Sequence, residues 1–442
     1  MDTISVIGLG KLGAPIAACL ASKGYRVIGV DVDAGKVELI NRGIAPVLEP
    51  GLEELLRQCR ETLSATDDIE GAVVQSDVSF IIVPTPSAER GAFSVRHVIE
   101  VCKLIGAGMR TKGRYHLVVV TSTVLPGAIE QEVKPVLERH SGARCGVDFG
   151  LCYNPTFVAL GSAIRDFMNP DVLVIGEADT RAGDTLLMLY RNMCENNPRI
   201  ARMNFVNAEI TKLAVNTYVT TKITFANMLA RICEHTPGTD VDVVTFAMGL
   251  DSRIGAKCLR GAVGYGGPCF PRDNLALAYF GRVVGAAASL AEVTDRANRE
   301  QVPRLAAVVK SRLRPGGSVA ILGLSYKPGT DVVDESQGLL LAKLLSEDGV
   351  SVAVYDPWAM DNARKKLDGS ARFAQSAQEC VGLADVIVIV TPWEEFQRMP
   401  ARAFGLDKQR KVVIDCWRVM RSEELASIAE YVPLGVGLDR WQ

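Results

Sequence analysis

A six-residue stretch near the start of the chain, Gly8-Leu-Gly-Lys-Leu-Gly13, constrains the fold most strongly. The apolar run Ile4–Ile7 leads directly into it, and a helix-forming segment follows that ends near Gly24. A second strand-like run, Arg26–Val30, comes next and closes on an acid, Asp31. The order of strand, GxGxxG turn, helix, strand and acid predicts the first βαβ unit of a dinucleotide-binding domain.

Each residue of this pattern has a physical role toward a dinucleotide. Gly8 makes the tight turn, Gly10 lets the pyrophosphate approach the backbone, and Gly13 allows the helix to pack closely on the strand. Asp31 would accept hydrogen bonds from the adenosine ribose and repel a phosphate there, so we expect NAD rather than NADP. The alternative is a glycine-rich turn that binds no ligand. Such a turn would not require the surrounding order of strand, helix, second strand and acid. Further residues expected at the cofactor are Lys11, Leu12 and Lys36.

Strand-like and helix-like segments continue to alternate after this unit. The apolar runs Val78–Val83, His116–Val120 and Asp171–Ile175 predict further strands of a doubly wound parallel sheet. Hydroxyl residues follow the first two runs, and such sheets bind ligands in loops at the carboxyl ends of their strands. These residues are candidates for the cofactor or substrate, or alternatively helix caps; they are Thr85, Ser122 and Thr123.

The segment Asn207–Ala230 contains no glycine or proline and predicts a long helix. Four polar residues recur on it at spacings of three and four, which places them on one helix face. They are Glu209, Lys212, Asn216 and Thr220. Such a stripe is commonly the solvated side of a helix. Alternatively, Lys212 and Asn216 face a cysteine loop further along the chain, where a lysine supplies charge to a developing oxyanion and an asparagine holds an oxygen or a water.

That loop, Gly264–Asp273, reads GYGGPCFPRD and places a cysteine at the start of a predicted helix. Its paired glycines permit a tight turn, and Pro271 suits the first helical position. Cys269 would lie where helix amides converge, which favours the thiolate and lowers the thiol pKa. It is therefore a candidate nucleophile, although free cysteines are mostly buried apolar residues. Asp273 either complements the helix dipole or positions a catalytic water.

The last part of the chain echoes the first βαβ unit with one substitution. Ser318–Gly329 and Ser351–Asp356 repeat the pattern, but Ser325 stands in place of the second glycine. A dinucleotide pyrophosphate would fit poorly there, so we expect this unit to hold a different nucleotide. Lys327 and Arg418 lie past strand ends and are either phosphate contacts or surface cations. Further parallel strands are predicted at Asp385–Val390 and Lys411–Asp415.

These patterns together predict an α/β protein with two Rossmann-like doubly wound domains, joined by a central helical segment with one long helix. The formal net charge is -2, which favours a small-molecule partner over nucleic acid or an anionic membrane. The chain starts directly with a strand and has no apolar run long enough to span a bilayer, so we expect a cytoplasmic protein. Its 11 cysteines form no CxxC pair and its 4 histidines lack ligand spacing, so no metal site is expected.

Seven motifs together resemble the UDP-glucose/GDP-mannose dehydrogenase family over essentially the whole chain. They are GLGKLG at Gly8–Gly13, EPGL at Glu49–Leu52, VPTP at Val83–Pro86, STVLPG at Ser122–Gly127, EITKLAVN at Glu209–Asn216, GYGGPCFPRD at Gly264–Asp273 and GLSYKPGTD at Gly323–Asp331. The resemblance implies that the chain oxidises the primary alcohol of a nucleotide hexose, a UDP-sugar such as UDP-glucose, to the acid with two NAD. It also implies an NAD-binding domain over residues 1–200, a catalytic and dimer-forming helical segment over 201–300, and a nucleotide-sugar domain over 301–442.

The resemblance further implies roles for particular residues. A cysteine matching Cys269 captures the intermediate aldehyde as a thiohemiacetal, which the second hydride transfer converts to a thioester. Residues matching Lys212 and Asn216 stabilise charge on oxygen. Residues matching Asp273 and Thr123 hold a water that relays the proton. The substrate side would include Thr156, Phe157, Arg253, Arg260, Tyr265, Gly266, Lys327 and Arg418, with Arg253 supplied by the neighbouring subunit of a homodimer.

The chain departs from the family at two places. The family loop NPEFLxEG carries a glutamate that activates water for thioester hydrolysis, but Thr156 and Leu160 occupy its acidic positions here. A threonine hydroxyl is not a general base near neutral pH. The arginine of the family segment DxxRES, a cofactor contact, is Asp334. Either another group performs the hydrolysis, or oxidation halts at the aldehyde or thioester, or the substrate differs. A nucleotide-sugar or NAD binding protein without turnover is a further alternative.

Overall fold

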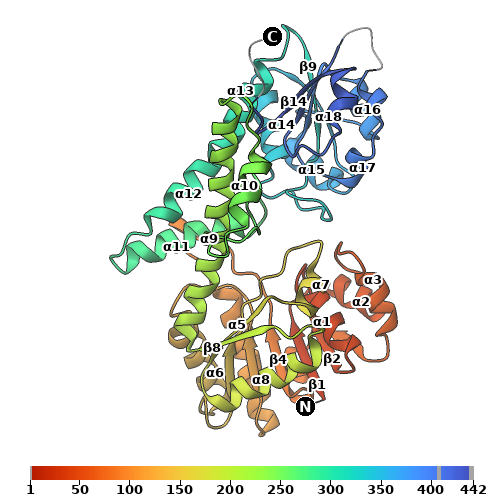
Figure 1. The fold of residues 1–442 in the computed structure, drawn as a ribbon. Helices are drawn as coiled ribbons and strands as arrows, with labels where there is room; N and C mark the ends of the chain where they lie inside the picture. Colours follow the sequence, from red (N-terminus) through yellow and green to blue (C-terminus); the bar gives the residue numbers. More distant parts are fainter. Residues whose placement is uncertain (1, 406–409, 438–442) are drawn as a thin grey trace. The chain divides into compact units, whose positions relative to one another are not determined.

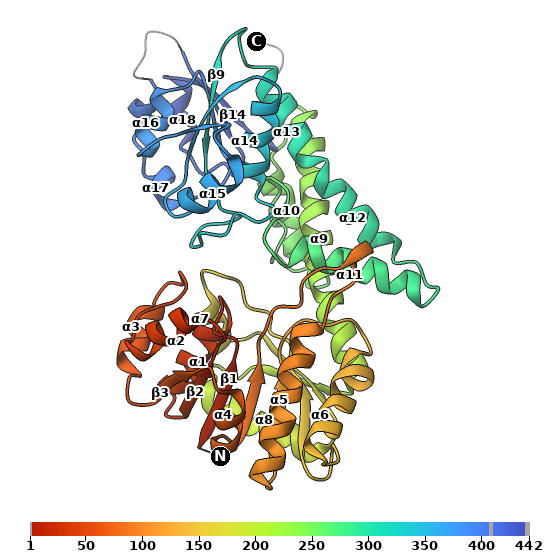
Figure 2. The same cartoon turned by 180° about the vertical axis from the view of Figure 1, so that it is seen from behind.

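The computed structural model describes residues 2–405 and 410–437. The chain folds as two compact units, Met1–Ala214 and Val215–Gln442, each with its own sheet (Figures 1 and 2). The division falls within the long helix α9 (Phe205–Glu234). This helix confirms the one predicted over Asn207–Ala230 and is longer at both ends.

The sheet of the first unit is built around the predicted βαβ unit. Its strands are β1 (Thr3–Ile7), β2 (Arg26–Val30), β3 (Leu63–Thr66), β4 (Val78–Ile81), β5 (Leu117–Val120), β6 (Gly150–Tyr153), β7 (Val172–Glu177) and β8 (Arg199–Met203). They lie in the order β3-β2-β1-β4-β5-β6-β7-β8, and the first six follow the order of a Rossmann domain. β7 covers the segment predicted as a further parallel strand, but it pairs antiparallel with β6, because the chain turns back between them without a crossover.

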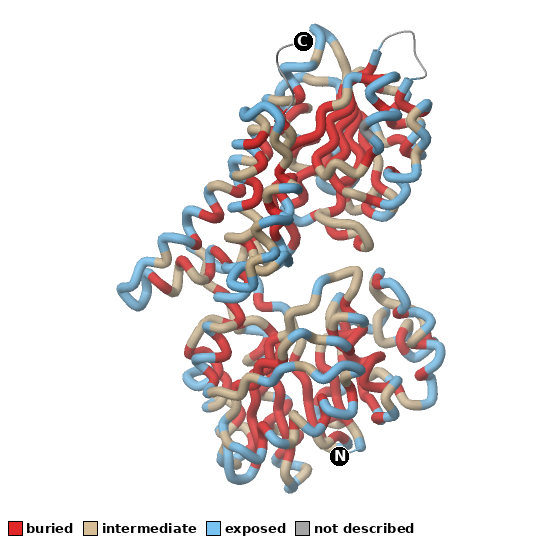
Figure 3. The backbone as a smooth tube through the Cα atoms, in the orientation of Figure 1, coloured by how far each residue is buried: buried red, intermediate tan, exposed pale blue. Residues whose placement is uncertain are grey.

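The strands of this sheet are continuous apolar runs because both faces are covered by helices. In β5, Leu117 and Val119 belong to one hydrophobic core, while Val118 and Val120 belong to the other. Figure 3 shows the inner strands of the sheet buried along most of their length, whereas the edge strands β3 and β8 are largely intermediate or exposed. The helices of the unit are α1 (Gly13–Ser22), α2 (Ala34–Asn41), α3 (Leu52–Gln58), α4 (Ile69–Gln75), α5 (Arg96–Lys112), α6 (Lys134–Ser141), α7 (Ala163–Met168) and α8 (Thr180–Met193).

The second unit repeats this architecture after a set of helices. Its strands are β9 (Ser318–Leu322), β10 (Ser351–Tyr355), β11 (Arg372–Phe373), β12 (Val386–Ile389), β13 (Val412–Asp415) and β14 (Glu430–Pro433). They run parallel in the order β11-β10-β9-β12-β13-β14, which is again the Rossmann order. Helices of the sheet are α13 (Gln301–Lys310), α14 (Gln337–Glu347), α15 (Met360–Leu367), α16 (Ala377–Gly382), α17 (Glu394–Gln397) and α18 (Ser422–Ala426).

The second unit begins with the remainder of α9, followed along the chain by α10 (Val241–Gly249), α11 (Phe270–Val283) and α12 (Ser289–Arg299). The predicted fold class, two Rossmann-like domains with a central helical segment, is thus confirmed, while the functional boundaries at residues 200 and 300 stay predictions. No helix within residues 2–405 or 410–437 is long and apolar enough to cross a bilayer.

The same tight turn opens both sheets. Gly8 has φ +98° and Gly323 has φ +105°, values that glycine adopts readily. A Cβ on Gly13 would lie 1.7 Å from the carbonyl oxygen of Gly8, and a Cβ on Gly338 would lie 2.0 Å from that of Gly323. The helix after each turn therefore packs directly on the turn, and no larger residue fits at the contact.

Replacing Gly338 by alanine should destabilise the second unit by about 2 kcal/mol, because the methyl group would overlap the backbone of Gly323. The matched control is Gly382→Ala at the end of α16, where a Cβ meets no atom within 4 Å. Urea unfolding followed by circular dichroism measures both variants. Equal midpoints for the two would contradict the steric role of Gly338.

Candidate active site

The glycine turn of the first unit leaves one side open to a ligand. A Cβ on Gly8 would lie 2.5 Å from the carbonyl oxygen of Ile82, whereas a Cβ on Gly10 meets no protein atom within 4 Å. Gly10 therefore borders open space just before α1, where the helix amides and dipole favour a phosphate group. The residues present fit a dinucleotide pyrophosphate at this turn.

Asp31 lies beside the turn, directly after β2. Its Oδ2 accepts a hydrogen bond from the Leu9 N–H at 2.7 Å, and its Oδ1 accepts one from the Asp33 N–H at 3.0 Å. Lys36 forms an ion pair with the same carboxylate, with Nζ 3.4 Å from Oδ2. These contacts hold the acid where the ribose of a dinucleotide would lie. The cofactor contacts of Lys11, Leu12 and Lys36 stay predictions.

The corresponding acid of the second unit, Asp356, is fully buried and saturated with hydrogen bonds. Its Oδ2 accepts from the N–H groups of Leu324 and Ser325, from the Ser325 hydroxyl, and from Trp393 Nε1, all between 2.8 and 3.1 Å. Its Oδ1 accepts two further backbone N–H groups. The Ser325 hydroxyl and the Trp393 indole thus bind the Asp356 carboxylate in addition to the backbone N–H groups. This turn therefore offers a dinucleotide no ribose acceptor.

Hydrogen bonds from two hydroxyl groups join the loops that follow β4 and β5. Thr85 Oγ1 donates to the Thr123 carbonyl at 2.7 Å, and Ser122 Oγ donates to the Val83 carbonyl at 2.7 Å. The helices that follow these loops have Val95 and Ala128 at their N-cap positions, so the alternative of helix caps is wrong for Thr85 and Ser122. Their contacts with cofactor or substrate stay predictions.

The polar stripe of α9 is buried, so the interpretation as a solvated face is wrong. Glu209, Lys212, Asn216 and Thr220 are 0, 8, 7 and 0% exposed. Lys212 Nζ donates to the carbonyl of Thr156 at 2.7 Å and lies 4.9 Å from the ring centroid of Phe157. The ammonium group is therefore seated against the loop that contains two of the predicted substrate residues.

Two buried acids that the sequence analysis did not assign to the site also hold loops of the first unit. Glu49 accepts hydrogen bonds from the N–H groups of residues 161 and 163, both at 2.7 Å, and so fixes the far end of the loop that Lys212 holds. Glu209 accepts from the N–H groups of Gly127 and Ile129 at 2.6 and 2.9 Å. Burial raises the pKa of Glu209 to about 7, although both N–H groups lower it. The motifs EPGL and EITKLAVN contained these acids, but spacing alone gave them no partner.

Cys269 is exposed and immediately precedes α11, which confirms the predicted position of the thiol at a helix start. Pro271 lies in the first turn of the helix. The Asp273 N–H donates to the Cys269 carbonyl at 2.8 Å, so the first turn closes directly onto the cysteine. The convergent N–H groups of this turn are the feature that stabilises a thiolate in such a position.

The second half of the polar stripe faces the helix that Cys269 begins. Asn216 Nδ2 donates to Asp273 Oδ2 at 2.6 Å, which confirms the predicted orientation of Asn216. One turn further, Thr220 Oγ1 donates to Asn274 Oδ1 at 3.0 Å. Asn274 Nδ2 in turn donates to the hydroxyl of Tyr265 at 2.7 Å. Tyr265 is buried in this network, so its predicted contact with substrate stays a prediction.

The glycines of the cysteine loop pack against the segment that follows β9. A Cβ on Gly266 would lie 2.3 Å from the carbonyl oxygen of Glu335, and one on Gly267 would lie 2.7 Å from the ring of Tyr326. The Gly267 N–H donates to the carbonyl of Asp334 at 2.9 Å. Both positions require glycine because a side chain would collide with the neighbouring segment. At Gly267 the φ of +86° is a second reason, since other residues rarely adopt it. A substrate contact of Gly266 stays a prediction.

Arg418 is engaged by protein groups. Its guanidinium forms a bidentate ion pair with Asp242 of α10 at 2.7 and 2.8 Å, and it also donates to the carbonyls of Leu434 and Gly261. Its side chain is 7% exposed. These contacts support a structural role that joins α10 to the second sheet, because few of its donors remain for a phosphate. Its substrate contact stays a prediction.

The other predicted cations differ in their surroundings. Arg253 is 86% exposed and pairs with the nearby Asp251 at 2.6 Å. Arg260 donates to the carbonyl of Trp417 at 2.8 Å. Lys327 Nζ lies 5.9 Å from a neighbouring tyrosine ring. None of these contacts tests the predicted binding of substrate.

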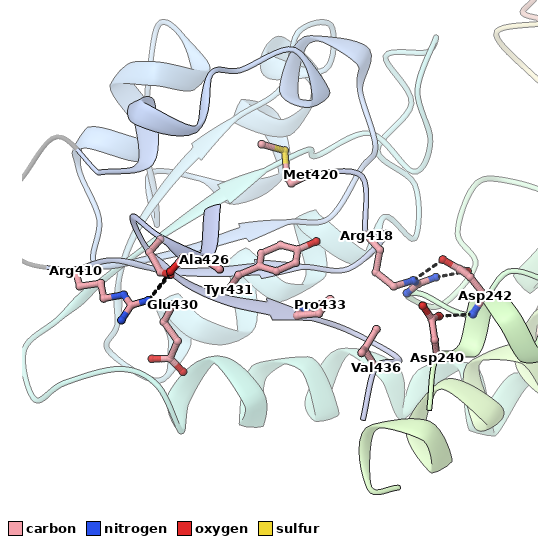
Figure 4. Close-up of a pocket in the computed structure, with 11 residues that line it drawn as sticks. Asp240, Asp242, Arg410, Arg418, Met420, Ala426, Glu430, Tyr431, Pro433 and Val436 are labelled. Carbon is pink, nitrogen blue, oxygen red and sulfur yellow. Dashed lines mark hydrogen bonds and ion pairs between the residues drawn. The ribbon is translucent and has the colours of Figure 1, made fainter. Parts of the chain in front are cut away.

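A pocket of about 860 Å³ lies beside β14 in the second unit (Figure 4). Figure 4 shows Arg418 directed toward Asp242, and Arg410 directed toward the backbone at Ala426, whose carbonyl it binds at 2.7 Å. Asp240 and Glu430 also line the pocket. Arg418 is paired with Asp242, Arg410 already donates to two backbone carbonyls, and acids line the same pocket, so the pocket is poorly suited to an anion such as a phosphate.

Comparison with protein families places these features in one context. The NAD binding domain of the UDP-glucose/GDP-mannose dehydrogenase family matches residues 2–194, its central domain matches residues 206–300, and its UDP binding domain matches residues 320–422. The chain belongs to the UDP-glucose/GDP-mannose dehydrogenase family. It is accordingly an NAD-dependent nucleotide-sugar dehydrogenase, and the cofactor and substrate class expected from the sequence are confirmed.

Relatives of this dehydrogenase align over almost its whole length. UDP-glucose 6-dehydrogenase AglM of Haloferax volcanii is 35% identical over 425 residues, which cover 95% of this chain and 98% of the relative. GDP-mannose 6-dehydrogenase of Pseudomonas putida is 36% identical over 416 residues, or 90% and 93% of the two chains. The structure of a UDP-glucose dehydrogenase from Pyrobaculum islandicum superimposes with a TM-score of 0.88 at 37% identity, covering 99% and 98%.

Two positions distinguish this dehydrogenase from the family pattern, and both make their observed contacts through the backbone. The carbonyl of Thr156 accepts from Lys212, and the carbonyl of Asp334 accepts from Gly267. Neither contact uses the side chain by which the chain departs from the family pattern.

Replacing Gly10 by alanine should weaken NAD binding at least about tenfold while leaving the folded state intact, because the methyl group would occupy ligand space and not protein space. Calorimetric titration with NAD and thermal unfolding measure the two properties separately. Gly382→Ala, distant in the sequence and equally uncrowded, is the control and should change neither. Unchanged NAD affinity in the Gly10 variant would contradict the assignment of the cofactor turn.

Proposed function

We propose that this dehydrogenase oxidises the primary alcohol of a nucleotide hexose, with UDP-glucose as the first candidate, to the uronic acid in two NAD-dependent steps. The observation that carries the proposal is Cys269 at the start of α11, with Asp273 and Asn216 hydrogen-bonded one turn behind it. A dehydrogenase that stopped after one hydride transfer would need no exposed thiol at that position. Relatives named UDP-glucose and GDP-mannose 6-dehydrogenases support the oxidation at a primary alcohol.

The proposed reaction balances as follows. Removal of a hydride from the alcohol carbon and a proton from its oxygen gives an aldehyde; NAD, which the turn Gly8–Gly13 would hold, would supply the hydride acceptor in both oxidation steps. The Cys269 thiolate adds to the carbonyl carbon, and the oxygen takes a proton to give a thiohemiacetal. Loss of a second hydride and the hydroxyl proton gives a thioester, whose C–S bond water then cleaves. One alcohol, two NAD and one water yield one carboxylate, two NADH and three protons.

We assign the charged steps to groups that the structure holds firmly. Lys212 and Asn216 would stabilise negative charge on the reacting oxygen, and Thr123 and Asp273 would hold the water that relays protons. Since Thr156 cannot act as a base near neutral pH, we also assign activation of the hydrolytic water to Asp273, one helical turn from Cys269. The comparisons favour neither halted oxidation nor a binding protein without turnover.

With UDP-glucose or another accepted nucleotide hexose, we expect two NADH for each sugar consumed and no lasting mass increase on the enzyme. Cys269→Ser should lower the formation of carboxylate by more than about 100-fold, because a serine hydroxyl is a far weaker nucleophile than a thiolate. Cys258→Ser, which replaces another exposed cysteine, is the control and should retain activity. Absorbance at 340 nm and intact mass spectrometry measure the outcome.

A single NADH for each sugar, or a Cys269 adduct that persists, would mean that oxidation halts where Thr156 departs from the family. Failure to oxidise any of a panel of UDP-linked and GDP-linked hexoses would overturn the proposal itself. Comparison of kcat/KM across this panel identifies the base and the sugar.

We also propose that the chain forms a homodimer through an apolar face of α9 and α10. Ordinary surface helices bury their apolar side, but α9 buries its polar stripe and exposes apolar residues that recur at intervals of three, four and seven. A continuous exposed apolar face is typical of an interface, and a second copy of the chain is its simplest occupant. Its members are Tyr218, Phe225, Met228 and Ile232 on α9, Val243 and Phe246 on α10, and Leu250 directly after α10, all between 43 and 71% exposed.

Arg253 follows α10 by four residues and is strongly exposed. It is therefore available to reach a neighbouring subunit, as the resemblance implies. Location in the cytoplasm, also expected from the sequence, stays a prediction.

The double variant Phe225→Glu/Ile232→Glu should convert the dimer to a monomer, because two charges would be buried at each copy of the interface. Sedimentation velocity measures the mass of the particle. Val147→Glu places the same charge on an exposed valine of the first unit and should leave the dimer intact. A wild-type chain that sediments as a monomer, or a double variant that stays dimeric, would contradict this interface.

A further inference from the structure

Glu209 is a buried acid for which the proposed reaction has no chemical use. It is fully buried near the start of α9, and both of its carboxylate oxygens accept backbone N–H groups. Oε2 accepts from Gly127 at 2.6 Å and Oε1 accepts from Ile129 at 2.9 Å. Hydrogen bonds to a carboxylate are stronger than those between neutral groups, so the two together form a firm tie between helix and turn.

The turn that Glu209 binds is the end of the segment Ser122–Gly127, which carries Thr123. Gly127 has φ +95°, so its N–H direction depends on a conformation that other residues rarely adopt. At the opposite end of the segment, the Ser122 hydroxyl binds the carbonyl of Val83. The segment is thus fixed to the end of β4 at one side and to α9 at the other.

We propose that Glu209 is a positioning residue that ties this segment to α9 and thereby sets Thr123 in place relative to Lys212. Glu209 and Lys212 lie three residues apart on the same buried face of the helix, so a shift of the turn relative to α9 would alter the spacing of the two functional groups. The inference rests on the proposed function for the roles of Thr123 and Lys212. It adds a residue that neither contacts the substrate nor transfers a proton.

The electrostatics of Glu209 give this tie a measurable signature. Burial raises the pKa of its carboxyl to about 7, the N–H groups of Ile129 and Gly127 lower it, and the charges of Glu130 and Glu132 raise it further. Lys212 is the cation on the same helix face. In the ionised carboxylate both oxygens are free to accept, one from each N–H group. Protonation places a hydrogen on one oxygen and weakens the hydrogen bond that this oxygen accepts. As the pH falls through about 7 the tie should loosen, and kcat should fall with it.

Glu209→Gln tests the proposal, because it replaces one acceptor oxygen with an NH2 group that opposes a backbone N–H. We expect kcat to fall about tenfold or more from misplacement of the segment, with KM for the nucleotide sugar changed less than about threefold. The acidic decline of kcat near neutral pH should disappear, since glutamine does not titrate. Hydrogen exchange of a peptide spanning residues 122–133 should show faster exchange at Gly127 and Ile129.

Glu132→Gln is the matched control. This exposed residue makes no contact in the proposed mechanism, so the maximal kcat should stay at the wild-type value. Loss of its charge should move the acidic decline of kcat to lower pH, because Glu132 raises the pKa of Glu209. A purely structural role for Glu209 would produce no such displacement.

The outcomes separate the possibilities. A Glu209→Gln enzyme with wild-type kcat, or one with reduced kcat but an unchanged acidic decline, overturns the inference. If that variant does not fold, the wild-type enzyme decides, and a kcat that does not fall as the pH drops through about 7 overturns the inference. A wild-type enzyme that oxidises no nucleotide sugar overturns the proposed function instead, while hydrogen exchange in Glu209→Gln still tests the tie itself.

Discussion

The burial of a polar helix face is the constraint on which both units depend. A polar group removed from water must find a hydrogen-bond partner inside the protein, or the fold loses stability. Three buried residues of the polar stripe on α9 have found one: Glu209 binds a turn, Lys212 binds the carbonyl of Thr156, and Asn216 binds Asp273. The partners are backbone groups of two loops in the first unit and, in the second unit, the Asp273 side chain in the first turn after Cys269. The buried polar face of α9 therefore orders these loops and this turn.

Much of the fold could be predicted because it is encoded in local pattern. The glycine turn at Gly8, the apolar runs and the glycine-free segment of α9 each specify a local conformation, and both sheets follow from their alternation. The position of Cys269 could also be predicted, since proline and glycine mark the helix start around it.

What could not be predicted depends on partners far apart in the chain. Helical spacing places Glu209 and Asn216 on one face, but it cannot say whether that face meets water or protein, and here it meets protein. The antiparallel direction of β7 and the loop-holding role of Glu49 depend on where the chain returns after long connections. The partner of Arg418 also lies far away in the chain, because Asp242, more than 170 residues earlier, engages its guanidinium.

The closed turn of the second unit has a consequence for occupancy. Two sheets with the same order of their first six strands would suggest two equivalent dinucleotide sites in each chain. In the second unit, however, the carboxylate of Asp356 already accepts hydrogen bonds from Leu324, Ser325 and Trp393. Saturation at one dinucleotide for each chain follows from this arrangement. An inhibitor built on the adenosine half of NAD would accordingly find a single class of site in each chain, without a second, weaker site from the duplicated architecture.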